Sequence, residues 1–178
     1  QPLHTSNPAT IQFALVNGLH NENNGSADQV DFRVFNKQTP TAFTGPLTDR
    51  SGKGNYAYLE ADQANGKTAI LTTPCFNLAA TQTPMAEFYA HMNGANMGEL
   101  HLDAVIDGRL VKDIATPLFG TQGNDWVKIS ANLSAYKNNT LVLAIRATVG
   151  SGNASDIAID DMRVYDAQTA PVAGFYAN

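Results

Sequence analysis

The sequence predicts an all-β fold, in the form of a two-sheet jelly-roll β-sandwich. Apolar and polar residues alternate between turn signals along the chain, and no segment combines a sustained helical stripe with caps at both ends. Roughly ten short strands on a chain of 178 residues suit two packed sheets. The predicted strands are 11–16, 31–35, 56–60, 68–71, 86–92, 99–106, 109–115, 127–132, 141–149 and 157–164.

The strongest local turn signal is the pair Asp107-Gly108, which separates strands 99–106 and 109–115. A two-residue type I′ turn needs a positive φ at both central residues, and Asp-Gly adopts that conformation at low cost. We therefore expect these two strands to be antiparallel neighbours.

Length and composition fit one folded domain. The chain is 43% hydrophobic, which is enough for a packed interior, and only 15% of its residues are charged. Its net charge of −5 disfavours a nucleic-acid partner and an anionic membrane surface, because both require a basic footprint. Cys75 is the single cysteine, so an intrachain disulfide is excluded. No apolar run is long enough to span a bilayer, and we expect no membrane insertion.

The two ends of the chain depart from the alternating pattern. Residues 1–10 form a polar segment with two prolines. Residues 169–171 have the composition of a linker, and residues 171–175 resemble the opening strand of an immunoglobulin-like repeat of the polycystic-kidney-disease type. We therefore expect one domain over residues 1–168, with residues 169–178 leading into a further domain of a longer protein.

Four segments, taken in order, resemble one known family. Residues 45–51 read GPLTDRS, residues 54–60 read GNYAYLE, residues 87–94 read EFYAHMNG, and residues 156–162 read DIAIDDM. This set is similar to the MAM family (meprin, A5 protein, receptor phosphatase mu) and covers about residues 31–164. The resemblance implies a jelly-roll sandwich used for adhesion or substrate recognition, often with a structural cation.

Two departures from the family pattern narrow this interpretation. Arg50-Ser51 stands where the family has His-Thr, and the cysteines that cross-link members from animal cell surfaces are missing. The resemblance therefore implies a bacterial-type, cysteine-poor, exported relative, and it disfavours homophilic adhesion of the receptor type.

Acidic residues in these segments are the candidate cation ligands. Asp160 and Asp161 end a predicted strand, where successive side chains point to opposite faces, so one carboxylate must turn toward the core or its rim. A buried carboxylate is costly unless it is paired or bound to a cation. We expect these two residues to hold a structural calcium ion, with Asp49 and Glu60 as further candidate ligands. The alternatives are hydrogen bonds to backbone amides for the first pair and ordinary surface positions for the other two.

His91 and His101 would face the same side of neighbouring strands if the loop at 93–97 closed a hairpin. Two histidines without a third ligand at fixed spacing do not make a zinc site, so we expect partly buried, hydrogen-bonded histidines. Trp126 precedes a predicted strand and is likewise expected to pack rather than to bind a ligand.

The sequence contains no nucleophile elbow, zincin helix, phosphate loop or dinucleotide fingerprint. We therefore predict a non-catalytic adhesion or recognition module of a secreted or cell-surface protein, with an extracellular protein or polysaccharide as its partner. The alternative is a carbohydrate-binding module attached to a secreted glycoside hydrolase or protease. A hydrolase with carboxylate chemistry is a third hypothesis, because the spatial separation of acidic side chains cannot be read from sequence.

Overall fold

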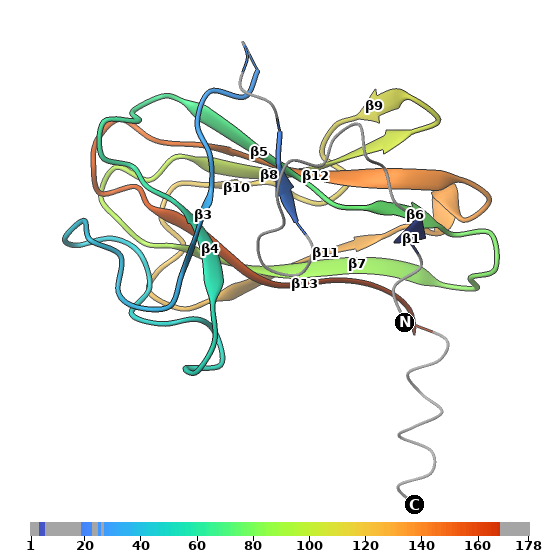
Figure 1. Cartoon of the computed structure of the whole chain (residues 1–178), viewed down its shortest axis with the longest axis horizontal. Helices are drawn as coiled ribbons and strands as arrows, with labels where there is room; N and C mark the ends of the chain where they lie inside the picture. The colour runs from blue at the N-terminus through green and yellow to red at the C-terminus, as the bar shows by residue number, and fades with distance from the viewer. Residues whose placement is uncertain (1–3, 6–18, 23–24, 26, 168–178) are drawn as a thin grey trace, which may run out of the picture.

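Two antiparallel β-sheets pack face to face and form a β-sandwich, which confirms the predicted fold class (Figure 1). The structure is a computed structural model that describes residues 4–5, 19–22, 25 and 27–167. The upper layer in Figure 1 holds β5, β8 and β12, and the lower layer holds β7, β11 and β13. No helix among the described residues is long and apolar enough to cross a membrane.

The larger sheet has eight strands, and β12 lies at its centre between β8 on one side and β5 and β6 on the other. β9 and β10 pair with the far edge of β8, whereas β1 and β2 pair with β6 and β5. The strands of this sheet are β1 (His4–Thr5), β2 (His20–Asn21), β5 (Thr68–Thr72), β6 (Cys75–Asn77), β8 (Glu99–Ile106), β9 (Arg109–Val111), β10 (Leu118–Phe119) and β12 (Thr140–Thr148).

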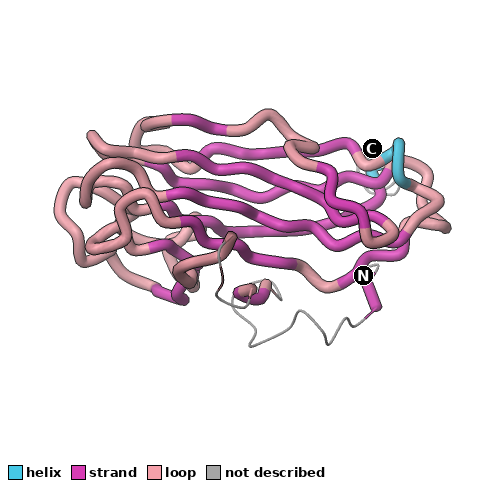
Figure 2. The backbone as a smooth tube through the Cα atoms, turned by 90° about the horizontal axis from the view of Figure 1, so that it is seen from above, coloured by secondary structure: helices cyan, strands magenta, loops and turns pink. Residues whose placement is uncertain are grey.

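The smaller sheet has five strands in the order β11-β7-β13-β4-β3. The view from above shows the strands of the sandwich running nearly parallel to its long axis, with loops gathered at both ends (Figure 2). The strands of this sheet are β3 (Arg33–Phe35), β4 (Tyr56–Leu59), β7 (Pro84–Met92), β11 (Val127–Asn132) and β13 (Ile157–Asp166). A short 3-10 helix, Ser134–Tyr136, follows β11.

The main core lies between the sheets because each strand turns alternate apolar side chains inward. On β12, Leu143 and Ile145 are fully buried, and on β7 Phe88 is fully buried opposite them in the same cluster. A second apolar cluster lies on the outer face of the smaller sheet, where Tyr56 and Tyr58 pack with neighbouring aromatic rings. Burial on both faces of β4 shows that the connection before it folds over this end of the sheet.

The predicted strands that fall in the described residues are present, with ends that differ by a few residues. The predicted strand at 11–16 and the segments 1–3 and 168–178 lie outside the described residues. Asp107 and Gly108 have φ angles of 51° and 78°, and the strands on either side pair antiparallel, as predicted. The prediction missed the short strands β6 and β10 and the two-residue strands β1 and β2.

The loop at 93–97 does not close a hairpin, so the condition under which His91 and His101 would face the same side of neighbouring strands is not met. β7 belongs to the smaller sheet and β8 to the larger one, so this loop crosses between the two layers. Two glycines permit the close backbone packing at this end. A Cβ atom on Gly98 would lie 1.9 Å from the carbonyl oxygen of Thr148, and one on Gly150 would lie 1.7 Å from the carbonyl oxygen of Asn96.

Replacing Gly98 with alanine should therefore destabilise the domain by roughly 1–3 kcal/mol, because the new methyl group meets backbone that cannot move independently. Thermal or urea unfolding measures this loss. Gly123→Ala is the matched comparison: its Cβ would meet nothing, and only its φ of 85° opposes the change, at a cost of about 1–2 kcal/mol. A Gly98→Ala variant with unchanged stability would show that the crossing is looser than described.

Candidate binding surfaces and carboxylate clusters

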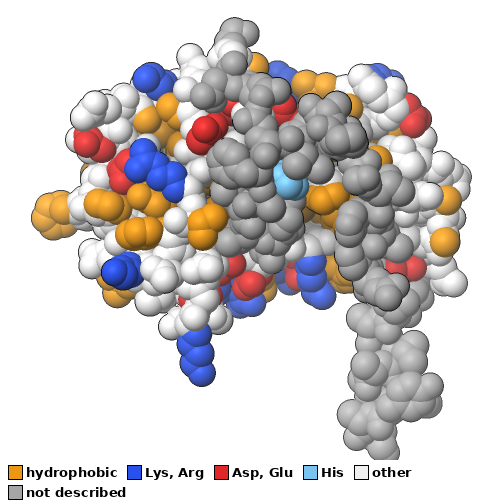
Figure 3. Space-filling view, in the orientation of Figure 1, with side chains coloured by type: hydrophobic (Ala, Val, Ile, Leu, Met, Phe, Trp, Pro, Cys, Tyr) orange, Lys and Arg blue, Asp and Glu red, His pale blue; other side chains and the backbone are white. Residues whose placement is uncertain are grey.

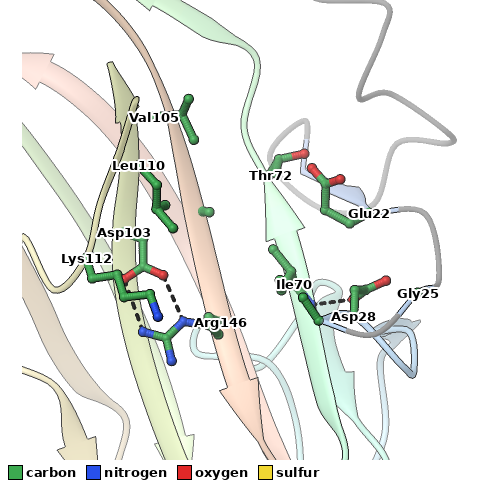
Figure 4. A pocket seen from close by; sticks show the side chains of 12 residues that line it. Glu22, Gly25, Asp28, Ile70, Thr72, Asp103, Val105, Leu110, Lys112 and Arg146 are labelled. Atoms are coloured by element: carbon green, nitrogen blue, oxygen red, sulfur yellow. Dashed lines mark hydrogen bonds and ion pairs between the residues drawn. The ribbon is translucent and has the colours of Figure 1, made fainter. Parts of the chain in front are cut away.

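A groove crosses the outer face of the larger sheet, and most of the surface that lines it is apolar. Its volume is about 460 Å³. Strands β5, β8, β9 and β12 form its floor and one wall, and residues of the connection after β2 form the other wall (Figure 4). Its lining consists of Glu22, Gly25, Ala27, Asp28, Ile70, Thr72, Asp103, Val105, Leu110, Lys112, Ala144 and Arg146.

The floor of the groove contains a buried ion pair. Arg146 donates to Asp103 through Nε at 2.8 Å and through Nη2 at 3.3 Å, and the Asp103 side chain is almost fully buried. Burial works to raise the pKa of Asp103, but the guanidinium and the backbone N–H of Asp113 outweigh it, so the pKa lies below its usual range. The ion pair therefore gives the floor a fixed dipole without adding net charge.

The two walls differ in charge. Glu22 and Asp28 lie on one side in Figure 4, and Leu110 and Lys112 lie on the other, with aliphatic side chains between them. Burial raises the pKa of Asp28 to about 6, although its carboxylate accepts a hydrogen bond from the backbone N–H of Ile70 at 2.7 Å. A ligand with an apolar centre and a basic end would match this distribution.

His101 supports the wall that carries Lys112. Its Nδ1 lies 2.6 Å from Asp113 Oδ1, and its ring meets that of Phe119 edge to face at 5.5 Å. Asp113 has a positive φ of 55°, which is strained for a residue with a side chain. These contacts fix the segment after β9 against β8 and confirm His101 as a buried, hydrogen-bonded histidine.

His91 is also hydrogen-bonded and buried, and it lies on the other sheet. Its Nε2 is 3.1 Å from the side-chain oxygen of Asn124, and burial lowers its pKa. The ring of Trp126 packs against His91 and Tyr56 with centroid distances of 5.5 and 6.0 Å. Trp126 therefore packs as expected, and the two histidines form no pair because their strands belong to different sheets.

The acidic pair of β13 lies at a bulge. The pairing of β13 with β7 shifts between Asp160 and Arg163, and Asp161 has a φ of 53°. Asp160 is buried and accepts hydrogen bonds from the backbone N–H groups of Arg50, at 3.0 Å, and of Asp161, at 2.8 Å. Burial raises the pKa of Asp160 despite these bonds.

Asp49 and Asp161 complete the arrangement around Arg50. Asp49 accepts hydrogen bonds from the Ser51 hydroxyl at 2.6 Å and from the Gly54 backbone N–H at 2.9 Å, which folds the loop on itself. Arg50 Nε lies 2.6 Å from Asp161 Oδ2. Asp160 thus accepts backbone amides, as the alternative for the acidic pair expected, whereas Asp161 pairs with the Arg50 side chain. Asp49 is buried, so it does not occupy the surface position named as its alternative.

The fourth predicted ligand, Glu60, lies elsewhere, beside Asp156. Asp156 is 0% exposed and accepts a hydrogen bond from the Ala61 backbone N–H at 2.9 Å, while its Oδ2 is buried without a hydrogen-bond partner. Burial raises the pKa of Asp156 to about 7, and the nearby charge of Glu60 adds to this. Glu60 accepts a hydrogen bond from the hydroxyl of Thr41 at 2.6 Å.

Within the described residues, no three histidine, cysteine or acidic side chains are grouped so that they could hold a metal ion. Sequence reasoning did not single out Asp156 or Arg50 as site residues. Both stand inside the segments that carry the family resemblance, so that resemblance was the available signal. Their partners are far away in sequence. Arg50 and its hydrogen-bond partner Asp160, for example, are 110 residues apart.

Comparisons with known proteins agree with this geometry. The family model described as "MAM domain, meprin/A5/mu" matches residues 22–169. Neuropilin-1 of Xenopus laevis is 31% identical over 123 residues, which cover 67% of this chain and 13% of that protein. MAM domain-containing glycosylphosphatidylinositol anchor protein 2 of Homo sapiens is 32% identical over 146 residues, which cover 75% of this chain and 15% of that protein. The chain thus spans a small part of each relative.

Solved structures with a similar fold have different functions. The carbohydrate-binding module TmCBM61, in complex with beta-1,4-galactotriose, has a TM-score of 0.53 at 15% identity and covers 84% of this chain and 89% of its own. A cyclase from Fischerella sp. TAU has a TM-score of 0.53 at 11% identity and covers 86% of each chain. At these identities the likeness shows the β-sandwich fold alone, and function must be argued from the surfaces. From the family match over residues 22–169 we conclude that the chain belongs to the MAM domain family.

Proposed function

We propose that this chain is a non-catalytic recognition module of a secreted or cell-surface protein and that its groove binds a segment of an extracellular protein. The family relationship supports an extracellular adhesion or binding module. The observation behind the choice of surface is the groove on the larger sheet, where an aliphatic floor lies between an acidic wall and a basic one. Such a site suits an extended peptide segment with an apolar side chain and a basic one.

The lining of the groove favours a protein partner over a sugar. Its described lining residues include no aromatic ring, and sugar faces bind most readily against such rings. The carbohydrate-binding alternative therefore depends on the fold, and a glycan array run beside a protein panel tests it.

Leu110→Asp should weaken binding to any partner recognised in a panel of extracellular proteins by at least tenfold. The side chain of Leu110 is exposed at 53%, so the variant should fold, but it places a charge where the ligand's apolar group would lie. Val34→Asp, an exposed apolar position on β3 of the other sheet, is the control and should bind normally. Equal loss in both variants, or binding to glycans alone, would contradict the proposal.

Calcium is a second part of the proposal, and Glu60 with Asp156 is the place that fits it best. The carboxylates of Asp49, Asp160 and Asp161 already accept hydrogen bonds from amides, a hydroxyl or a guanidinium. At Asp156, in contrast, a buried carboxylate oxygen meets no donor in hydrogen-bond geometry, and the carboxylate of Glu60 and the hydroxyl of Thr39 lie close to it. Oxygen ligands of this kind suit a hard divalent cation.

Calcium should raise the melting temperature relative to chelator, because a ligand that binds only the folded state stabilises it. At one hundred times the dissociation constant the gain is about 2.7 kcal/mol, or roughly 5–10 °C for a domain of this size. Asp156→Asn should abolish the rise, and Asp161→Asn should retain it. Identical melting curves in calcium and in chelator would remove the proposal, and loss of the rise in Asp161→Asn alone would return the ion to the acidic pair of β13.

The raised pKa of Asp28 predicts a pH dependence of stability. Between pH 4 and about 6 the folded protein keeps a proton that the unfolded chain has released, so the free energy of unfolding falls as the pH rises through this window. Asp28→Asn should make this fall shallower, because the amide oxygen still accepts the N–H of Ile70 and carries no charge, while the raised pKa of Asp156 keeps part of the fall. Parallel profiles for Asp28→Asn and the wild type would contradict the prediction.

A further inference from the structure

The outer face of the smaller sheet contains a polar depression of about 470 Å³ next to the acidic pair of β13. Strands β7 and β13 and the loop that contains Arg50 form it. Its lining consists of Arg50, Glu87, Tyr89, Asp161, Met162 and Arg163. This depression is separate from the groove, which lies on the other sheet. Charged side chains of both signs also lie among apolar ones over the end of the molecule that carries β3 and β4 (Figure 3).

Arg50 is held rigidly at the edge of the depression. Its backbone N–H donates to Asp160 at 3.0 Å, and its Nε donates to Asp161 at 2.6 Å. The guanidinium carbon lies 3.9 Å from the centre of the Tyr89 ring, which is a cation–π distance. Backbone, Nε and guanidinium plane are therefore all fixed.

Arg163 repeats this arrangement on β13. Its Nε donates to Glu87, and its guanidinium carbon lies 3.9 Å from the centre of the Tyr165 ring. Lys128 lies 3.7 Å from the same glutamate. Two arginines with the same pair of supports thus line one depression, so little side-chain entropy remains to be lost when they bind a ligand.

Both arginines use only Nε for their carboxylate partners. Among the hydrogen bonds of the described residues, none is donated by an Nη nitrogen of Arg50 or Arg163. The Nη edge of a guanidinium binds the two oxygens of a carboxylate or sulfate in parallel, which lysine cannot do. Two such edges are available in one depression.

We propose that this depression binds acidic polysaccharide, with the oxyanion of a sugar unit, a uronate carboxylate or a sulfate ester, accepting hydrogen bonds from the Nη groups of Arg50 and Arg163. The charges of the two arginines and of the two lining carboxylates sum to zero. The arrangement of the Nη donors therefore selects the ligand, and not a strong positive electrostatic potential. A sugar ring also carries hydroxyl donors for Asp161 and Glu87. An aspartate or glutamate side chain of a peptide offers acceptors only, and it would leave those carboxylates facing a like charge.

Biolayer interferometry with five polymers tests the proposal. Polygalacturonate carries carboxylates alone, dextran sulfate carries sulfates alone, chondroitin sulfate carries both, and dextran and poly-L-glutamate are the uncharged and the peptide controls. The domain should bind at least one acidic polysaccharide at least tenfold more tightly than either control. The first two polymers show which oxyanion is preferred, and binding to either one supports the proposal.

Variants show whether the depression is the site. Arg163→Gln and Arg50→Gln should each weaken this binding at least tenfold. Arg50→Lys should lose as much affinity as Arg50→Gln, because lysine keeps the positive charge but lacks the two parallel N–H donors of a guanidinium. Arg109→Gln, an exposed arginine on β9, and Leu110→Asp in the groove should bind as the wild type does. Melting temperatures show that each variant folds, and Arg163→Gln decides the question if Arg50→Gln does not fold.

Four outcomes would overturn the proposal. These are no binding to any acidic polysaccharide, equal binding to dextran, equal or tighter binding to poly-L-glutamate, and an equal loss in Arg109→Gln and Arg163→Gln. If only Leu110→Asp weakened binding of the acidic polysaccharide, the polysaccharide would bind in the groove and not in the depression. The Leu110 and Arg163 variants therefore distinguish failure of this inference from failure of the proposed function.

Discussion

Buried aspartates at the start of β13 hold the long connection between β3 and β4, and the segment just after β4, against the smaller sheet. Asp160 accepts the backbone N–H of Arg50, and Asp156 accepts that of Ala61, while the N–H of Asp156 donates to the hydroxyl of Thr44. A carboxylate deprived of water is costly unless it is partnered, so these bonds are strongly constrained. The positions of Arg50 and of the turn before β4 follow from them.

The sandwich presents two outer faces with different chemistry. The larger sheet offers an aliphatic groove with the Asp103–Arg146 ion pair in its floor, and the smaller sheet offers arginines stacked on tyrosines beside carboxylates. Strands form the floors of both surfaces and hold those side chains more rigidly than loops do, while loops contribute Arg50 and the acidic wall of the groove. On the two proposals above, a module with two such faces can contact a protein and a polysaccharide at the same time.

The sequence was sufficient for most strands because their side chains alternate with a period of two. It was insufficient where few residues are involved: β6 and β10 are too short to show a period, and a glycine-rich loop such as 93–98 has the same composition whether it closes a hairpin or crosses between sheets. The strand pattern predicted that one of Asp160 and Asp161 would turn inward, and in the structure Asp160 is the buried one. Its partner could not be predicted, because a distant arginine loop and a cation both satisfy a buried carboxylate. Glu60 and Asp156 are far apart in the sequence and close only in the fold, so their pairing could not be predicted either.

Amide hydrogen exchange at Arg50 tests most directly the claim that Asp160 positions this connection. Arg50 lies in an exposed loop, so its N–H should exchange slowly only if the carboxylate of Asp160 accepts it. We predict strong protection in the wild type, and loss of that protection in Asp160→Ser while the amides of β7 stay protected. Exchange of the wild-type Arg50 amide at the rate of an unprotected loop would contradict the account.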